Sequence, residues 1–353
     1  MVTKKKIAIF IGRFAPFHNG HNKILQHCNQ NYDETIVFVG SSNKRRTLKN
    51  PFEPNIVRNW IEKAGNETTH VVLSKDFLYN DMKWITQIED SVYTLFNKEV
   101  CEFTIVGHNK DESSYYLKIF PNWLVDELPN FEEGLNATDI RDIMFDDKID
   151  RQPYKNQLLS EIEGFVPQFV FEDIKTYIET EQHYEMLVEK NYFEREAKKF
   201  ENYPYPDTLK FNCSDAVVVC DGNVLLIERK VAPGKGTWAL PGGFVNTNET
   251  YEQCAIRELF EETNLKVPEK VLKGSCKGSK VFDHPKRNEG IPRITNAFYF
   301  VIQPDYKNGF PKLPKVKGSD DASNAKWFPI AEVRHMKLFD DHEFILDFFV
   351  NSI

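Results

Sequence analysis

The chain has 353 residues, of which 41% are hydrophobic and 28% charged, and its formal net charge is −8. This length favours two domains over one, and the composition is that of an ordinary globular protein. The negative charge argues against a nucleic-acid platform, and no apolar run approaches the roughly 20 residues of a membrane span.

Six cysteines lie far apart without a Cys-x-x-Cys pair, and several sit in apolar runs such as VVVC. This usage predicts reduced core thiols, and the short run IAIFI lacks a signal-peptide cleavage site, so we expect a cytoplasmic protein. We also expect no nucleic-acid or membrane partner, and a homo-oligomer stays open.

Strand-like runs alternate with helical stretches from residue 1 to 168. The strand-like runs include IAIFIG, TIVFVG, HVVLS and EFTIVG, and the helical stretches include IVRNWIEKA and WITQIEDSVYTLF. Because strands that alternate with helices form a parallel sheet with crossover helices, residues 1–168 are predicted to be an α/β domain.

The character of the chain changes after this region. Residues 169–204 are highly charged and compatible with a helix, and YPYP then breaks the chain, so we expect a connecting helix or linker there. In residues 205–353, the strand-like runs FNCSDAVVVC, NVLLIERK, NAFYFVIQ and AKWFPI surround one clear helix near 250–263. This pattern predicts an α+β domain.

The stretch GRFAPFHNGH, residues 12–21, follows the first predicted strand. A strand, a loop and a helix with Asn19 as its expected N-cap form an anion site, because the amides and the helix dipole favour phosphate there. His18 and His21 can share one face of this helix start and donate hydrogen bonds to one polyphosphate. Alternatively, one histidine is a surface cap and the other a packed core residue.

Other residues of this stretch suit the same site. Arg13 adds a cation, and Gly12 and Gly20 allow the backbone to approach a ligand closely. The stretch resembles the Gly-x-Phe-x-Pro-x-His-x-Gly-His signature of the nucleotidyltransferase superfamily, with every signature position present. The resemblance implies a Rossmann-like fold in which ATP is the co-substrate and is bound by Gly12, Arg13, Phe14, His18 and His21.

That superfamily has a second signature, a Ser/Thr-rich helix start that ends in arginine, and this chain has NATDIR at residues 136–141. Thr138 is the expected N-cap, and Arg141 lies one turn later, so a triphosphate could be held from both ends. Asn136 and Ala137 stand where serine or glycine is more usual. The resemblance implies that Thr138 and Arg141 bind phosphate and that His18, His21 and Arg141 are catalytic.

The acceptor is read from the middle of the first domain. The stretches TLKNPF, YNDMKW and IVGHNKDESSYYLKIFP resemble the nicotinamide mononucleotide adenylyltransferases, especially those fused to a second enzyme. The resemblance implies adenylyl transfer from ATP to nicotinamide mononucleotide, giving NAD and pyrophosphate. Nicotinate mononucleotide or another phosphate ester stays open as the acceptor.

Three residues are candidates for binding the mononucleotide. Trp84 could stack on a cationic pyridine ring, or it could pack on the inner face of its helix. Asn80 and Asp81 could recognise an amide or form a turn. Lys44, Arg45 and Arg46 could approach phosphates, although a charged run is more often a solvated loop.

Residues 242–265 read GGFVNTNETYEQCAIRELFEETNL. Thr250 and Gln253 form a candidate capping box, which predicts a helix start. On that helix, Glu258, Glu261 and Glu262 stand at i, i+3 and i+4, so their carboxylates gather on one face. Oxygen ligands alone select a hard cation, Mg²⁺ or Mn²⁺. The alternative is a solvated acidic helix face.

The spacing of this stretch matches the Nudix box of pyrophosphohydrolases, except that Asn264 stands where the family has glycine. Asparagine tolerates the left-handed conformation, so we expect the helix end to survive the change. The resemblance implies a mixed sheet sandwiched by helices. It also implies catalytic and metal-binding roles for Glu258, Glu261 and Glu262, a metal-binding carbonyl at Gly243, and supporting roles for Glu249 and Arg257.

Substrate choice lies outside the box. FDHPKRNEGIPRITNAFYF and SDDASNAKWFPIAEV resemble the ADP-ribose-cleaving members, which implies hydrolysis of ADP-ribose to AMP and ribose 5-phosphate. Another nucleoside diphosphate, or an ADP-ribose sensor without hydrolysis, stays open. Glu289, Asp320 and Asp321 are candidates for the general base.

Overall fold

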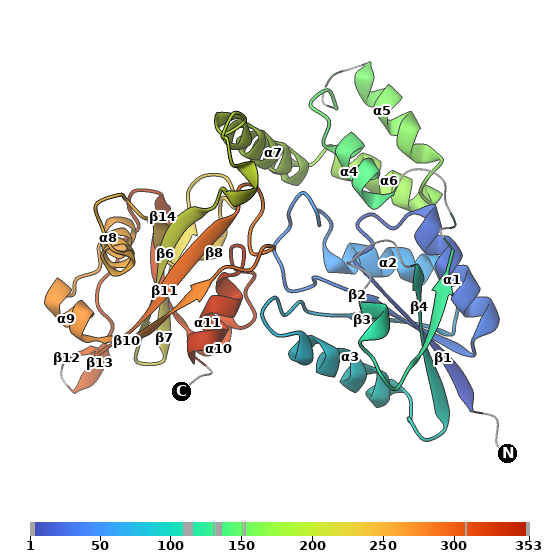
Figure 1. Cartoon of the computed structure of the whole chain (residues 1–353), viewed down its shortest axis with the longest axis horizontal. Coiled ribbons are helices and arrows are strands. Elements are labelled where there is room, and N and C mark those ends of the chain that lie inside the picture. The colour runs from blue at the N-terminus through green and yellow to red at the C-terminus, as the bar shows by residue number, and fades with distance from the viewer. Residues whose placement is uncertain are drawn as a thin grey trace. The chain divides into compact units, whose positions relative to one another are not determined.

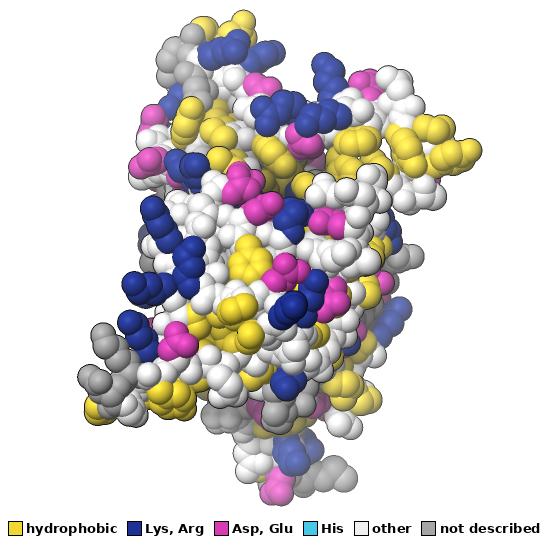
Figure 2. All heavy atoms as spheres, turned by 90° about the vertical axis from the view of Figure 1, so that its left-hand side faces the viewer, with side chains coloured by type: hydrophobic (Ala, Val, Ile, Leu, Met, Phe, Trp, Pro, Cys, Tyr) yellow, Lys and Arg dark blue, Asp and Glu magenta, His cyan; other side chains and the backbone are white. Residues whose placement is uncertain are grey.

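The computed structural model describes residues 4–108, 116–129, 131, 136–149, 151, 153–307 and 309–350. The chain divides into two compact units, Met1–Lys190 and Asn191–Ile353. No helix in the described ranges is both long and apolar enough to cross a membrane. On the face drawn in Figure 2, basic and acidic side chains are interspersed.

The first unit is built on a parallel sheet whose described strands follow the order β3-β2-β1-β4-β5 (Figure 1). The strands are β1 (Lys5–Gly12), β2 (Glu34–Val39), β3 (Thr69–Leu73), β4 (Cys101–His108) and β5 (Leu124–Leu128). The predicted parallel α/β architecture of this region is therefore confirmed.

Side chains of β1 alternate between two cores because successive residues of a strand point to opposite faces. Ala8 and Phe10 join the core that α1 and α2 cover, whereas Ile7 and Ile9 join the core that α3 covers. These helices are α1 (Asn19–Asn31), α2 (Pro54–Ala64) and α3 (Asp81–Leu95). Helices on both faces leave the strand ends as the place for a ligand.

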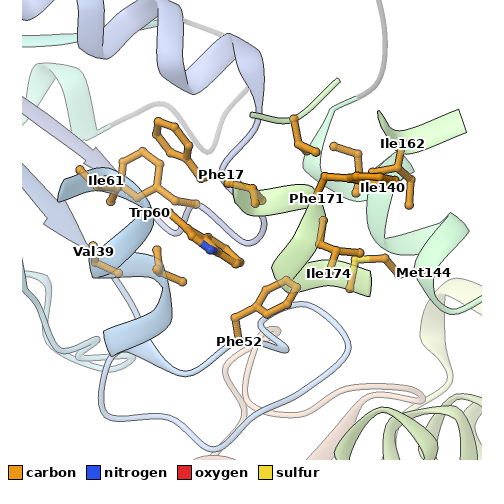
Figure 3. Close-up of a cluster of buried hydrophobic side chains, with 14 of the residues drawn as sticks. Phe17, Val39, Phe52, Trp60, Ile61, Ile140, Met144, Ile162, Phe171 and Ile174 are labelled. Atoms are coloured by element: carbon orange, nitrogen blue, oxygen red, sulfur yellow. The ribbon is translucent and has the colours of Figure 1, made fainter. Parts of the chain in front are cut away.

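The helices that follow the sheet extend the first core. They are α4 (Ala137–Met144), α5 (Tyr154–Glu163), α6 (Gln168–Tyr177) and α7 (Glu181–Lys199). Figure 3 shows Phe171 and Ile174 of α6 among the buried side chains around Trp60 and Phe52, whose ring centroids lie 4.8 Å apart. The stretch expected to connect two domains therefore contains two helices, and α6 packs into the first core.

The second unit contains a mixed sheet whose described strands follow the order β10-β11-β6-β7-β14, with β8 paired to β7 and β9 to β6. Strands β6 and β11 are parallel, and the other pairs are antiparallel. The strands are β6 (Phe211–Cys220), β7 (Asn223–Arg229), β8 (Trp238–Ala239), β9 (Gly242–Phe244), β10 (Cys276–Phe282), β11 (Arg293–Ile302) and β14 (Ala322–Pro329). A short hairpin of β12 (Asp305–Lys307) and β13 (Phe310–Lys312) and the 3₁₀ turn η2 (Pro206–Thr208) lie outside this sheet.

Helices sandwich this mixed sheet, as predicted. Ala255 and Leu259 of α8 (Tyr251–Thr263) pack with Ala216 of β6, and α9 (Glu269–Gly274) adds to the same face. The other face packs against α10 (Ile330–Val333) and α11 (His342–Val350), through clusters that include Val217, Val333 and Ile345. The buried Ala255 and Leu259 account for the apolar side of α8, so its other side is available for carboxylates.

Candidate active sites

The loop after β1 lies at the carboxyl edge of the parallel sheet. Gly12 ends β1, and its carbonyl accepts a hydrogen bond of 2.9 Å from the amide of Gly40, which follows β2. Ser42, after β2, donates from its amide to the carbonyl of Ser74, after β3, over 3.1 Å. Arg13 is exposed at this edge. The ends of three neighbouring strands are thus tied together where a ligand is expected.

Two imidazoles organise the start of α1. The N-cap is His18, not Asn19 as expected: His18 Nδ1 accepts from the amide of Gly20 over 3.1 Å, and His21 Nδ1 accepts from the amide of His18 over 3.2 Å. Asn19 instead donates its side-chain amide to the carbonyl of Gly164 over 3.0 Å. Because both Nδ1 atoms accept, the proton of each neutral ring resides on Nε2.

The environment of His21 keeps its ring neutral. Its ring centroid lies 3.6 Å from that of His18, 5.0 Å from Phe14 and 5.8 Å from Phe17. Burial, and then the charge of His18, hold the pKa of His21 well below its ordinary value. His21 is therefore both a packed residue and, through Nε2–H, a hydrogen-bond donor without charge.

Gly12 and Phe14 shape the loop from within. Phe14 is 1% exposed and has a φ of 51°, and a Cβ on Gly12 would lie 2.8 Å from its ring. Glycine at position 12 therefore leaves room for the Phe14 ring. Any contribution of Phe14 to binding therefore passes through the shape of the loop.

Arg141 joins the two signatures of the first unit. Its Nη1 donates to the carbonyl of Ala15 over 2.7 Å, and its Nη2 donates to Thr138 Oγ1 over 3.1 Å. The N-cap of α4 is Asn136, not Thr138, because Asn136 Oδ1 accepts from the amides of Thr138 and Asp139 over 2.8 and 3.3 Å. The residue that departs from the family pattern therefore performs the capping.

The three candidates for mononucleotide binding lie at the start of α3. Asn80 is its N-cap and accepts from the amide of Lys83 over 2.9 Å, while Asp81 is exposed in the first turn. Trp84 is half-buried against Phe120, with ring centroids 5.9 Å apart. Residues 109–115 of the third acceptor-like stretch lie outside the described residues.

Lys44, Arg45 and Arg46 do not form a solvated loop. Arg45 and Arg46 are buried, at 6% and 8% exposure. Arg45 Nη1 lies 3.1 and 3.2 Å from the carboxylate oxygens of Glu189 on α7, and Arg46 donates to the carbonyls of Phe52 and Lys44. Sequence spacing carries no signal of this role, because Glu189 lies 144 residues from Arg45.

The helix α8 of the second unit begins and ends as predicted. Thr250 Oγ1 accepts from the amide of Gln253 over 3.2 Å, and Gln253 Oε1 accepts from the amide of Thr250 over 2.8 Å, which confirms the capping box. The helix ends at Asn264, whose φ of 46° and ψ of 34° are left-handed. Asparagine thus takes the conformation for which the family uses glycine.

Arg257 gathers three carboxylates. Its Nε and Nη2 donate to the two oxygens of Glu249 over 2.9 and 2.6 Å, and its Nη1 donates to Glu258 over 2.7 Å and to Glu261 over 2.9 Å. The hydrogen bonds from Arg257 lower the pKa of Glu249 to about 2. Glu249 therefore stays ionised and fixes the guanidinium that orients the other two acids.

Glu258 and Glu262 lie against the Gly242–Gly243 backbone. A Cβ on Gly243 would collide with the carboxylate of Glu258, which would have to move to admit a larger residue. Glu262 is 5% exposed, and its Oε2 accepts from the amide of Gly242 over 3.0 Å. Burial raises the pKa of Glu258, and it raises that of Glu262 to about 8. A solvated acidic face is therefore wrong for Glu262.

The oxygen donors here suit a hard cation. In the described parts of the chain, no three His, Cys, Asp or Glu side chains are already arranged around a metal position. Instead, Arg257 donates hydrogen bonds to one oxygen each of Glu258 and Glu261, and Glu262 accepts one from the amide of Gly242. Burial, and after it the neighbouring carboxylates, raise the pKa of Glu258 and Glu262. A divalent cation would offset the negative charge that these acids carry when ionised.

Of the three candidate bases, Asp320 is connected electrostatically to α8. Burial, then Glu261 and Asp320, act together to raise the pKa of Glu258. A further carboxylate that sequence reasoning missed is Asp215 on β6, which is 6% exposed and accepts from Thr295 Oγ1 over 2.6 Å. The single acid within the apolar run FNCSDAVVVC was the available signal.

Comparison with known proteins assigns a relative to each half. The family model described as cytidylyltransferase-like matches residues 9–124, and the model described as the NUDIX domain matches residues 211–348. The chain is 34% identical over 178 residues to a nicotinamide/nicotinic acid mononucleotide adenylyltransferase of Acinetobacter baylyi, covering 49% of this chain and 87% of that protein. It is 35% identical over 152 residues to an ADP-ribose pyrophosphatase of Methanocaldococcus jannaschii, covering 43% of this chain and 78% of that protein.

Solved structures include a match over both halves at once. A bifunctional NMN adenylyltransferase/ADP ribose pyrophosphatase from Francisella tularensis is 29% identical, with a TM-score of 0.85 and coverage of 99% of both chains. The same Francisella enzyme in complex with AMP and a manganese ion matches with a TM-score of 0.84. Similarity therefore extends across the junction between the two units as well as within each of them.

Proposed function

Since this chain belongs to the nicotinamide mononucleotide adenylyltransferases through its first half and to the Nudix ADP-ribose pyrophosphatases through its second, we propose that each reaction has its own site within the chain. The protein is a bifunctional enzyme of NAD metabolism. One activity transfers the adenylyl group of ATP to nicotinamide mononucleotide, and the other hydrolyses ADP-ribose to AMP and ribose 5-phosphate.

In the first reaction, a phosphate oxygen of the mononucleotide attacks the α-phosphorus of ATP, and pyrophosphate leaves. The nucleophile is already ionised, so the protein contributes position and charge rather than a base. His18 and His21 donate from Nε2 to phosphate oxygens, and Arg141 and Arg13 add positive charge. Gly12, Phe14 and Thr138 shape the walls of this site, and Asn80, Asp81 and Trp84 border the pyridine ring.

The contact that carries this assignment is the hydrogen bond from Arg141 to the carbonyl of Ala15. It supports one phosphate site with two walls, because Ala15 lies in the loop whose end carries His18. A guanidinium held by Ala15 and Thr138 has a fixed plane and a permanent positive charge, which suits a phosphate.

In the second reaction, water attacks a phosphorus of the diphosphate, and a phosphate oxygen of the other product leaves. We propose Mg²⁺ or Mn²⁺ as the metal, held by Glu258, Glu261, Glu262 and the Gly243 carbonyl. When bound, such an ion lowers the pKa of water and offsets phosphate charge. Arg257, fixed by Glu249, orients the carboxylates, and Asp320 is the proposed general base.

The two activities are tested separately. Purified protein is given ATP with nicotinamide or nicotinate mononucleotide while pyrophosphate is followed, and ADP-ribose with Mg²⁺ or Mn²⁺ while AMP is followed. We expect a dinucleotide from at least one mononucleotide, and AMP formation that stops when EDTA removes the metal. If ADP-ribose binds but AMP never forms, the second unit is a sensor and the proposed hydrolysis is wrong.

Two matched substitutions assign the sites. His18→Asn keeps a good N-cap but removes the Nε2 donor, so synthesis should fall about a hundredfold while hydrolysis persists. Glu262→Gln keeps an acceptor for the Gly242 amide but removes the charge, so the opposite pattern is expected. Loss of both activities from either change, in a folded protein, would contradict separate sites.

A further inference from the structure

Asn264 does more than end the helix α8. Its backbone takes the left-handed conformation, and its side chain also reaches a loop that lies more than fifty residues later in the chain. Nδ2 donates to Ser319 Oγ over 2.7 Å and approaches the carbonyl of Lys317 at 3.4 Å. A glycine at position 264 would supply the conformation but none of these contacts.

The same loop is bonded to the last turn of α8 by its own backbone. The amide of Ser319 donates to the carbonyl of Glu262 over 3.0 Å, and the amide of Lys317 donates to the carbonyl of Thr263 over 2.8 Å. Ser319 Oγ in turn donates to the carbonyl of Glu261. The Ser319 hydroxyl is thus held between Asn264 and the backbone of a proposed metal ligand.

Asp320 follows this bonded serine directly. Its backbone is left-handed, with a φ of 54°, and its carbonyl accepts from Lys230 Nζ over 3.3 Å. The next carbonyl, of Asp321, accepts from the amide of Lys230 over 3.0 Å. The loop is therefore held on one side by α8 and on the other by the end of β7, which restricts where the Asp320 carboxylate can lie.

We propose that Asn264 is a positioning residue for hydrolysis, which anchors Ser319 and thereby holds Asp320 beside the carboxylates of α8. The proposal rests on the hydrolase activity proposed above. The bond from the amide of Ser319, one residue before Asp320, to the carbonyl of Glu262 agrees with this placement. The departure from the family's glycine then has a function, because the Asn264 side chain adds bonds to the loop that glycine cannot make.

Asn264→Gly tests the anchor, since it keeps the left-handed backbone and removes only the side chain. We expect kcat for ADP-ribose hydrolysis to fall about tenfold, as for one lost positioning hydrogen bond, with KM changed less than about twofold. Ser319→Ala should have a similar effect, and the double variant should lose little more. The control Ser323→Ala removes another hydroxyl of this region, bonded to the carbonyl of Glu228, and should leave kcat unchanged.

Asp320→Asn tests whether Asn264 affects hydrolysis through Asp320. If Asn264 acts through Asp320, the Asn264→Gly change should cost almost nothing further in an Asp320→Asn background. An undiminished tenfold loss in that background would overturn the route through Asp320. A kcat within twofold of wild type for Asn264→Gly alone would reduce Asn264 to a helix terminator and overturn the proposal.

Amide hydrogen exchange separates the anchor from the proposed activity. The amides of Lys317 and Ser319 should exchange about tenfold faster in Asn264→Gly than in wild type, whether or not the protein hydrolyses ADP-ribose. Unchanged exchange would overturn the anchor itself. Failure of wild type to form AMP would count against the proposed function, while this exchange measurement would still decide whether Asn264 holds the loop.

Discussion

Arg141 of α4 donates a hydrogen bond of 2.7 Å to the carbonyl of Ala15, a residue 126 positions earlier in the chain. This contact places the end of one signature against the loop of the other. A phosphate site made from two distant segments needs both of them in place. The effect of Arg141 on dinucleotide synthesis can therefore be measured with a substitution at this position.

Arg141→Lys keeps a positive charge but loses the planar fork that serves Ala15 and Thr138 together. We expect dinucleotide synthesis to fall about a hundredfold, with ADP-ribose hydrolysis as the internal control for folding. Arg151→Lys, at an exposed position after α4, is the matched control and should retain full synthesis. Equal rates for the two variants would exclude a phosphate-binding role for Arg141.

Gly243→Ala should impair hydrolysis strongly, because the added Cβ forces the carboxylate of Glu258 away from its place beside the Gly243 backbone. We expect a loss of at least about a hundredfold in AMP formation, while dinucleotide synthesis is retained. Gly274→Ala is the control, since nothing lies within 4 Å of a Cβ at that position. Normal AMP formation by Gly243→Ala would show that Glu258 does not need its place against this backbone.

The buried pair of Arg45 and Glu189 should stabilise the first unit. Their side chains are 7% and 5% exposed and lie 3.1 Å apart, so Glu189→Ala leaves a buried charge without its main counterion. We expect a loss of about 3 kcal/mol in the free energy of unfolding, measured for the first unit by pulse proteolysis in urea. Glu172→Ala breaks an exposed pair with Lys175 and should cost less than about 0.5 kcal/mol.

His342 should make the second unit sensitive to acid. Its Nδ1 accepts from the amide of Leu240 over 2.8 Å, and burial lowers its pKa from 6.5 to about 4. Between these two pKa values, His342 is therefore protonated in the unfolded chain but neutral in the folded chain. The free energy of unfolding of the second unit is therefore highest above pH 6.5. It decreases as the pH falls towards about 4, by an amount on the order of 3 kcal/mol from His342.

His342→Asn isolates this effect, because an asparagine oxygen can still accept from Leu240 but does not titrate. In urea unfolding between pH 7 and pH 4, we expect the second unit of the variant to lose stability less steeply than wild type. Parallel pH profiles for the two proteins would show that His342 is protonated without cost in the folded state.

Much of both candidate sites could be read from local spacing. The loop between β1 and α1, the capping box of Thr250 and Gln253, and the left-handed Asn264 all lie within single short stretches. Neighbouring residues there determine the conformation, so the sequence was sufficient to predict a loop that leads into a helix after β1 and a capped helix that carries acids. Its errors were small shifts, such as N-caps at Asn19 and Thr138 instead of His18 and Asn136.

The tertiary structure alone decided which distant side chains meet. Arg45 pairs with Glu189 across 144 residues, Asp215 meets Thr295 across 80, and Asn264 reaches Ser319 across 55. The charged run from Lys44 to Arg46 predicts a solvated loop. Arg45 and Arg46 are nevertheless buried, and Arg45 pairs with Glu189 of another helix. Such pairs depend on strand order and on which helix covers which face, and the spacing of residues along the chain does not encode either, because both follow from the packing of the whole unit.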